Sequence, residues 1–366
     1  MFSLHLPINS TSFGQASLAI FKEIYKRDYN PCIFVQGGSA DLSVFEVDTP
    51  FADWLNKNIN RASQDHKRSD KLFSLWHLNG SLSSYSNKTY LFTFYELDSP
   101  TAIERNIAKN QEKVFVSSKF TQDRFEDLGA TNVEYIPLFF DKDNFHVIKE
   151  NDKPKQYFDD GRITFNVVGK FERRKHHQKI IQAWIKRFGN DRKYFLQLSI
   201  YNNFLKSEDN DKIVNTLTQG DAYFNVKPLL YMAKNSLYND YLNSADIVLG
   251  MSGGEGWALP EFHSCALGKH AVVLNAHAYK SWANDKNSIL VSPSGKTTAE
   301  DNMFFKPNTP FNQGKIFLWD EDAFINGCEK AIERVENNRV NEEGLKLQED
   351  FTVEKTVDKI LEFVGD

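Results

Sequence analysis

The stretch that decides the fold is ADIVLGMSGGEGWALPEFHSCALGKHAVVLNAHAYK, from Ala245 to Lys280. Its apolar runs at Ile247–Leu249 and Ala271–Leu274 predict two buried strands. Between them, a glycine-rich turn leads into a helix that begins near Pro260 and ends at Gly268, residues that suit those two positions. Strand, turn, helix and strand make a βαβ unit, which is the building block of a parallel sheet.

The turn of this unit carries three glycines, Gly253, Gly254 and Gly256, around a single acid, Glu255. Backbone N–H groups and the positive end of a helix meet there at the carboxyl edge of a sheet, which favours an anionic ligand. The glycines alone fit equally well a turn that only reverses the chain. The acid inside the turn and the motifs upstream favour the ligand site.

The same alternation of short strands and helices runs through the rest of the chain. Further strands are expected at Phe2–Leu6, Cys32–Val35, Tyr90–Phe94, Val114–Val116, Val133–Ile136, Ile163–Val168, Phe195–Ile200 and Ala222–Val226. Residues 51–75 are expected to be helical. The pattern predicts two doubly wound α/β domains with a cleft between them, and such a cleft is a default ligand site.

The polar segment from Lys142 to Arg162 has no hydrophobic period and is interpreted as the interdomain linker. We therefore expect an N-terminal domain over residues 1–152 and a C-terminal domain over 153–345. Residues 346–366 are expected to form a final helix that packs back on the N-terminal domain, with Thr352 as a plausible N-cap.

Composition excludes several classes of protein. The 366 residues exceed one ordinary core, and the net charge of −5 means that any contact with nucleic acid needs a local basic patch. Three distant cysteines, Cys32, Cys265 and Cys328, argue against a disulfide framework. No run is long enough to span a bilayer and no signal peptide is recognised, so we expect a cytoplasmic protein.

The second charged motif is GKFERRK, Gly169–Lys175, between a predicted strand and a predicted helix. Lys170 and Lys175 could hold a diphosphate as two point charges. A solvated basic turn is the commoner fate of such a run. The neighbouring His176 and His177 point apart on a helix and have no further ligand at suitable spacing, so no metal site is expected.

Two stretches of the first domain could also face a ligand. Tyr95 and Glu96 follow a predicted strand, although a lone glutamate is more often a surface residue. The polar loop from Asn9 to Gln15 follows the first strand, and a helix cap is its simpler explanation.

Together, these motifs resemble the retaining, nucleotide-sugar-dependent glycosyltransferases of the GT-B type, specifically family four. The family's strand–Gly-Arg-Leu…Lys motif is similar to Gly169–Lys175, with Lys170 in place of arginine. Its Ala-Asp, Ser and Glu-Gly-Phe-Gly-Leu-Pro run is similar to Ala245-Asp246, Ser252 and Glu255–Pro260. The resemblance covers most of the chain from Val114 to Val364.

The departures from the family pattern have consequences. The second glutamate of the signature, eight positions after the first, is His263 here, and Glu261 lies two residues earlier on another helical face. In the first domain, the family's Thr-x-His-Asp is replaced by Thr93-Phe-Tyr-Glu96. This set of variants is most similar to members encoded by tailed phages, which often modify hydroxymethylated pyrimidines in viral DNA.

The resemblance implies a GT-B fold, two Rossmann-like domains facing a central cleft, with the donor on the second domain and the acceptor on the first. It implies a hexosyl- or pentosyltransferase that uses a nucleoside diphosphate sugar, most simply a UDP-sugar, with retention and with no metal or other cofactor. The implied site residues are Glu96 and Glu255 as catalytic groups; Lys170, Lys175, Gly254 and Gly256 for the diphosphate; His263, Trp257 and Ser252 for the ribose and sugar; and Ser12, Gly14, Gln15 and Tyr95 on the acceptor or sugar side.

Modified DNA is the acceptor that the phage-like variants imply, which would place the protein in the cytoplasm of the host cell. A glycosyltransferase acting on a glycan or lipid, and a catalytically silent module that binds nucleotide or glycan, are the alternatives. The basic residues between Lys57 and Lys71 are interleaved with acids and do not decide for a membrane acceptor, but together with the phage-like variants they motivate the DNA hypothesis. Donor base, sugar and oligomeric state stay open at this point.

Overall fold

The computed structural model of the chain describes residues 2–149, 161–220 and 222–365. These residues separate into two compact units. Unit 1 runs to Asn144 and also holds Pro307–Gly314 and the chain from Gln348 onward, whereas unit 2 holds Phe145–Lys306 and Lys315–Leu347. The domain boundary predicted between residues 152 and 153 lies outside the described residues, as does part of the predicted linker.

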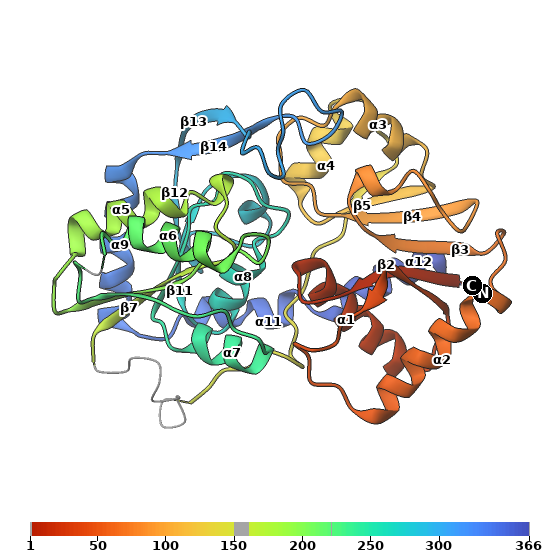
Figure 1. Cartoon of the computed structure of the whole chain (residues 1–366), viewed down its shortest axis with the longest axis horizontal. Coiled ribbons are helices and arrows are strands. Elements are labelled where there is room, and N and C mark those ends of the chain that lie inside the picture. The colour runs from red at the N-terminus through yellow and green to blue at the C-terminus, as the bar shows by residue number, and fades with distance from the viewer. Residues whose placement is uncertain (1, 150–160, 221, 366) are drawn as a thin grey trace. The chain divides into compact units, whose positions relative to one another are not determined.

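Unit 1 is built on a parallel six-stranded sheet in the order β2-β1-β3-β4-β5-β6 (Figure 1). Its strands are β1 (Phe2–Ile8), β2 (Cys32–Ala40), β3 (Lys71–Leu75), β4 (Lys88–Thr93), β5 (Lys113–Val116) and β6 (Val133–Tyr135). Its helices are α1 (Ser12–Lys26), α2 (Thr49–Asp65), the short η1 (Leu78–Gly80), α3 (Ala102–Lys109), α4 (Lys119–Glu126) and α12 (Val353–Val364).

The helix predicted over residues 51–75 is wrong in its second half. α2 ends at Asp65, and a turn follows in which Lys67 N–H donates to the Asp70 carboxylate at 2.8 Å. The chain then enters β3, a central strand between β1 and β4 whose Leu72 and Phe73 are fully buried. Strands buried on both faces show no polar alternation, so this short apolar run did not stand out from the helix before it.

The final helix, α12, begins as predicted. The side chain of Thr352 accepts a hydrogen bond from Lys355 N–H, so Thr352 is the N-cap. Within unit 1, α12 packs on α1 and β3. Arg27 Nη1 of α1 lies 2.6 Å from the Asp358 carboxylate of α12.

Unit 2 is built on a second parallel six-stranded sheet, in the order β12-β11-β10-β7-β8-β9. Its strands are β7 (Ile163–Val168), β8 (Tyr194–Ser199), β9 (Val226–Pro228), β10 (Ile247–Gly250), β11 (His270–Leu274) and β12 (Ser288–Val291). Its helices are α5 (His177–Phe188), α6 (Ser207–Leu217), α7 (Asn235–Asn243), α8 (Leu259–Ala266), α9 (Glu321–Asn337) and α10 (Glu342–Leu345), with the short η3 (Arg173–Lys175) and η4 (His277–Ser281). α11 (Leu347–Asp350) leads the chain back to unit 1.

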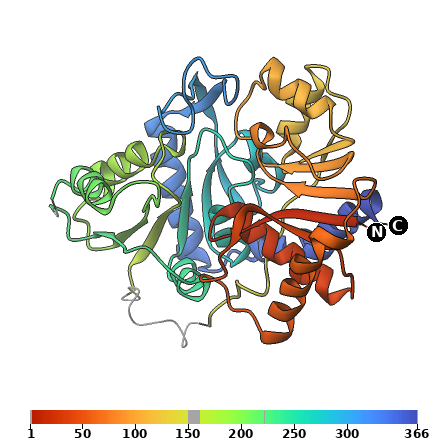
Figure 2. The ribbon, with the colours of Figure 1, turned by 45° about the vertical axis from the view of Figure 1, so that its right-hand side comes forward.

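The predicted βαβ unit is confirmed as β10, α8 and β11. α8 begins at Leu259 with Pro260 in its first turn. Gly268 follows the helix with φ +81°, a left-handed conformation that glycine adopts without strain. The doubly wound α/β architecture predicted for both halves is therefore present, and Figure 2 shows α9 (blue) lying along β11 and β12 of the second sheet.

An antiparallel hairpin of β13 (Pro293–Thr298) and β14 (Lys315–Trp319) was not predicted. β13 is largely exposed and has no apolar alternation, so the sequence carries no strand signal there. Between the two strands the chain enters unit 1 at Pro307 and leaves it at Gly314. There, Thr101 Oγ1 donates to the Pro310 carbonyl at 2.8 Å. Across the described ranges, no helix has the length and apolar character needed to cross a bilayer.

Candidate functional site

The turns after β7 and β10 lie side by side because these strands are neighbours in the sheet of unit 2. Gly253 N–H donates to the Arg174 carbonyl at 2.7 Å, and Phe317 N–H of β14 donates to the Gly253 carbonyl at 2.8 Å. A Cβ atom at position 253 would lie 2.4 Å from the Phe317 carbonyl oxygen, so glycine is required. The two motifs that the sequence singled out thus meet at one sheet edge.

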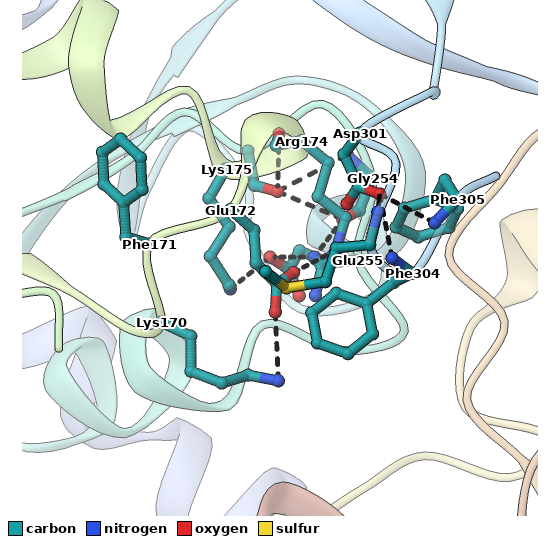
Figure 3. Close-up of polar contacts among 12 residues, drawn as sticks. Lys170, Phe171, Glu172, Arg174, Lys175, Gly254, Glu255, Asp301, Phe304 and Phe305 are labelled. Atoms are coloured by element: carbon teal, nitrogen blue, oxygen red, sulfur yellow. Dashed lines mark hydrogen bonds and ion pairs between the residues drawn. The ribbon is translucent and has the colours of Figure 1, made fainter. Parts of the chain in front are cut away.

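A buried ion-pair network joins these two turns (Figure 3). Lys175 Nζ lies 2.6 Å from Glu255 Oε1, and Arg174 Nη1 lies 2.8 Å from the same oxygen. Arg174 Nη1 also donates to the Gly254 carbonyl at 2.6 Å. All three charged residues are less than a tenth exposed. Buried charges are tolerated when they are paired and hydrogen-bonded in this way.

The network continues outward through a second carboxylate. Arg174 Nε lies 2.9 Å from Glu172 Oε2, and Lys170 Nζ lies 3.0 Å from Glu172 Oε1. Lys170, Arg174 and Lys175 supply three positive charges, and Glu172 and Glu255 supply two negative ones. One positive charge is left over, which favours an anionic ligand at this edge.

Electrostatics keep the inner pair ionised. Burial alone would raise the pKa of the Glu255 carboxyl, but the charges of Arg174 and Lys175 outweigh burial and hold this pKa well below its usual value. Burial likewise disfavours the Lys175 ammonium, yet Glu255 raises the pKa of Lys175 above its ordinary value. Both groups therefore stay charged through the physiological range.

A third acid, Glu261, lies in the first turn of α8 and is 3% exposed. Burial raises its pKa to about 7, with Lys175 opposing this effect and Glu255 adding to it. Tyr279 Oη donates to Glu261 Oε1 at 3.3 Å, and Oε2 has no hydrogen-bond partner among the described residues. A Cβ at position 250 would lie 2.7 Å from Glu261 Cγ, so Gly250 makes room for this carboxyl.

The side chains expected at the ribose and sugar are all buried in unit 2. His263 stacks on Phe145 with ring centroids 4.2 Å apart. Trp257 is 2% exposed, and its carbonyl accepts from the Trp282 indole N–H at 3.0 Å. Ser252 Oγ donates to the Gly254 carbonyl at 3.1 Å, so the serine helps to hold the turn itself. Gly256 is buried in the same turn.

The residues expected on the acceptor side belong to unit 1. Ser12 is exposed and Gln15 is half-buried in the first turn of α1, and Glu96 is half-buried after β4. A Cβ at Gly14 would lie 1.9 Å from the Asn9 carbonyl oxygen, so glycine lets the loop close over α1. Tyr95 is buried, and its hydroxyl donates to Glu104 at 3.1 Å inside the unit.

Arg174 and Glu172 are the network members that sequence reasoning missed. Both lie inside the quoted GKFERRK run, but the resemblance drew attention only to Lys170 and Lys175. The short helix η3 turns Arg174 and Lys175 toward Glu255, while Arg173 Nη1 reaches the Glu300 carbonyl at 2.5 Å. The single acid Glu172 among the basic residues of this run was the available signal.

The sequence predicts that Lys170 and Lys175 hold one diphosphate, but the two side chains differ in burial and in partner. Lys175 is buried against Glu255, whereas the side chain of Lys170 is 38% exposed and pairs with Glu172. His176 and His177 contact different carbonyls, those of Met251 and Val168. Over the described ranges, no three His, Cys, Asp or Glu residues come together in a way that could hold a metal ion.

No protein-family model matches the chain, and no curated protein matches its sequence. Solved structures do match it. Sucrose-phosphate synthase from Thermosynechococcus elongatus has a TM-score of 0.66 at 11% identity, covering 99% of this chain and 97% of that one. HepE from Anabaena, solved in complex with UDP-glucose, has a TM-score of 0.66 at 13% identity, covering 99% and 98%. A glycosyltransferase from Rickettsia africae has a TM-score of 0.68 at 11% identity, covering 99% and 98%. These likenesses show that the chain has the GT-B fold.

Proposed function

We propose that the protein is a glycosyltransferase that moves a sugar from a nucleoside diphosphate sugar to an acceptor hydroxyl. The observation that carries this proposal is the net-positive network of Arg174, Lys175 and Glu255, built at the glycine turn before α8. It lies at the carboxyl edge of a parallel sheet in a chain with the GT-B fold. That edge is the usual ligand site of doubly wound sheets.

The cations are suited to a leaving diphosphate. Negative charge builds on the diphosphate as its bond to the sugar breaks, and fixed positive groups stabilise that charge without reorganising. Glu255 holds Arg174 and Lys175 in place through one oxygen, Oε1. The N-terminus of α8 and the backbone at Gly254 and Gly256 add partial positive charge. No metal ion is required for this role.

The transfer itself proceeds with defined bond changes. The acceptor oxygen forms a bond to the anomeric carbon, the bond from that carbon to the diphosphate breaks, and the acceptor proton leaves with the diphosphate. We assign Glu255 Oε2 to a sugar hydroxyl, His263 to the ribose, and Glu96 of unit 1 to the acceptor side. We further propose a UDP-sugar as donor and retention of the anomeric configuration, with attack from the face that the diphosphate leaves.

The acceptor we propose is a hydroxymethylated pyrimidine in DNA. The motif variants support this choice, and so do basic residues on α2 and the turn after it. Two basic residues of this region are engaged within unit 1, since Arg61 of α2 pairs with Asp65 at 2.9 Å and Lys71 Nζ, at the start of β3, donates to the Gly365 carbonyl at 3.0 Å. DNA binding should therefore be weak and sensitive to salt.

The test combines donor binding with an acceptor panel. A thermal-shift screen of UDP-, GDP- and ADP-sugars identifies the donor, because a ligand that binds only the native state raises its stability. The protein is then incubated with that donor and with hydroxymethylcytosine-containing DNA, unmodified DNA, oligosaccharides or lipids. The products are digested, and mass spectrometry identifies those that carry the sugar.

Each outcome of the panel discriminates between the proposals. Sugar found only on the modified DNA supports the acceptor that we propose, and the anomeric proton coupling in that product reports retention or inversion. Transfer confined to a glycan or lipid contradicts the DNA acceptor but keeps the glycosyltransferase. Nucleotide binding with neither transfer nor donor hydrolysis identifies a silent binding module.

A further inference from the structure

Two phenylalanines and a lysine gather at the outer end of the ion-pair network. Lys170 Nζ lies 4.8 Å from the ring centroid of Phe204 and 5.0 Å from that of Phe304. The two rings meet edge to face with centroids 5.2 Å apart. We call these three residues the Lys170 cluster. Phe204 is 58% exposed, and a large apolar ring exposed beside a charged site often marks a binding surface.

The loop that presents Phe204 is built to hold its shape. Asn202 is fully buried; its N–H donates to the Asn210 side chain at 2.9 Å, and the Asn210 amide donates back to the Asn202 carbonyl at 3.1 Å. Asn202 Oδ1 accepts from Phe204 N–H at 3.0 Å. Asn202 Nδ2 donates to the Phe171 carbonyl at 3.0 Å, which ties this loop to the turn that carries Lys170.

The turn that presents Phe304 is equally constrained. One Asp301 carboxylate oxygen accepts hydrogen bonds from the backbone N–H groups of Met303, Phe304 and Phe305, at 2.8, 2.9 and 2.8 Å. Arg173 ties this turn to the β7 turn through the Glu300 carbonyl. Both aromatic rings are thus held on preorganised loops, which lowers the entropy cost of binding a ligand between them.

The Lys170 cluster is continuous with the diphosphate site that we propose. Lys170 Nζ and Arg174 Nε pair with opposite oxygens of the same Glu172 carboxylate. The exposed ring of Phe204 and the buried cations are therefore separated by little more than one carboxylate and one lysine side chain. Figure 3 shows Lys170 and the Phe304 ring on the Glu172 side of the network.

We propose that the Lys170 cluster receives the nucleobase of the donor, which stacks on Phe204 while the diphosphate contacts Arg174 and Lys175. This inference rests on the proposed function for the identity of the ligand. A flat aromatic ring attached to phosphates satisfies both the exposed phenylalanine and the nearby ammonium. An apolar partner surface would strip water from Lys170 without offering it a compensating charge.

The experiment measures the affinity of UDP, a UDP-sugar, ADP, GDP and inorganic pyrophosphate by titration calorimetry for the wild type and for Phe204→Ala. Phe224→Ala is the matched control, because Phe224 of unit 2 is 57% exposed and lies outside the cluster. We expect Phe204→Ala to weaken the preferred nucleotide about ten-fold or more while pyrophosphate affinity changes less than about two-fold. Phe224→Ala should leave both affinities unchanged. Circular dichroism and the melting temperature confirm that the variants are folded.

Three results would overturn the inference, and they can be told apart. Nucleotide affinity that is unchanged in Phe204→Ala removes the base from this cluster while the proposed function stands. A loss confined to the UDP-sugar, with UDP binding intact, assigns the ring to the sugar instead of the base. A wild type that binds no nucleoside diphosphate contradicts the proposed function itself, and the inference with it.

Discussion

Glu104 in unit 1 and Glu255 in unit 2 are both buried close to the carboxyl edge of their sheets, but the two carboxylates have different hydrogen-bonding partners. In unit 1, Glu104 accepts from three uncharged donors: Tyr95 Oη at 3.1 Å, Thr101 N–H at 2.7 Å and Asn312 N–H at 2.8 Å. In unit 2, Glu255 pairs with two cations, Arg174 and Lys175, at 2.8 and 2.6 Å.

The difference separates structural from functional burial. Thr101 caps α3, and Asn312 belongs to the 307–314 segment, so the hydrogen bonds to Glu104 serve the structure of unit 1. The cations around Glu255 carry charge that a diphosphate can share, since each can contact more than one anion. At the carboxyl edge of a sheet, a buried carboxylate that shares cations is therefore a better candidate for a ligand site than one held by uncharged donors alone.

The largest effect is expected for Glu255→Gln. Removing this charge leaves two buried cations without their shared partner, so the free energy of unfolding should fall by about 3–5 kcal/mol. Sugar transfer should fall by about a hundred-fold or more, because the preorganised charges are lost. Nucleotide affinity should change much less than turnover. Denaturant unfolding and single-turnover kinetics measure the two effects.

Glu104→Gln is the matched substitution in unit 1. It should cost about 1–3 kcal/mol of stability, because hydrogen bonds to a buried acceptor are weakened, and leave turnover within about two-fold of the wild type. If Glu104→Gln abolished transfer as completely as Glu255→Gln, the comparison between the two glutamates would be wrong.

Glu261→Gln should change the pH dependence of stability. The folded pKa of about 7 lies above the ordinary value of 4.5, so the unfolded chain releases this proton first as the pH rises. The free energy of unfolding of the wild type should therefore fall as the pH rises. This loss should be absent below pH 4.5, grow between pH 4.5 and pH 7, and reach about 3 kcal/mol above pH 7. Glutamine does not titrate, so the free energy of unfolding of the variant should rise relative to that of the wild type as the pH increases from 4 to 8.

Chemical unfolding at several pH values checks this expectation. A difference between Glu261→Gln and the wild type that stays constant from pH 4 to pH 8 would show that Glu261 has an ordinary pKa.

A smaller effect is expected for Lys175→Ala. From the sequence alone, we expect this change to leave the fold intact, but the buried pair with Glu255 makes some loss of stability unavoidable. Because Arg174 still pairs with Glu255, the loss should be about 1.5–3 kcal/mol, and nucleotide affinity should fall by a similar free energy. Calorimetry under conditions where the variant is folded separates the two; unchanged affinity would remove Lys175 from the site.

The smallest effect is expected for Asp358→Asn in unit 1. Its partner Arg27 lies 2.6 Å away, but the Asp358 side chain is 62% exposed, so solvent screens the pair. The change should cost about 1 kcal/mol or less, and the cost should shrink further in salt. A loss as large as that of Lys175→Ala would mean that burial does not distinguish these ion pairs.

Short-range patterns predicted much of the fold. The strands β7, β10 and β11 follow from apolar runs that lie next to glycines, and α8 from Pro260 and Gly268. β3 was missed because a strand buried on both faces resembles a buried helix segment. The β13–β14 hairpin was missed because the exposed residues of β13 show no apolar alternation.

The candidate site was predictable only where residues are neighbours in sequence. Glu255 stood out as the acid among glycines, and Lys175 as the end of a basic run. Its pairing with Glu255, 80 positions away, depends on β7 and β10 being adjacent in the sheet. Phe204 and Phe304 come from loops with no motif, so their meeting at Lys170 required the structure.

The most direct test of the account is the release of nucleoside diphosphate from the preferred nucleotide sugar, measured side by side for the wild type, Glu104→Gln and Glu255→Gln. The account predicts release by the wild type and Glu104→Gln at similar rates, and almost none by Glu255→Gln, although all three bind the nucleotide. No release by the wild type from any UDP-, GDP- or ADP-sugar, with the nucleotide nevertheless bound, would contradict the account.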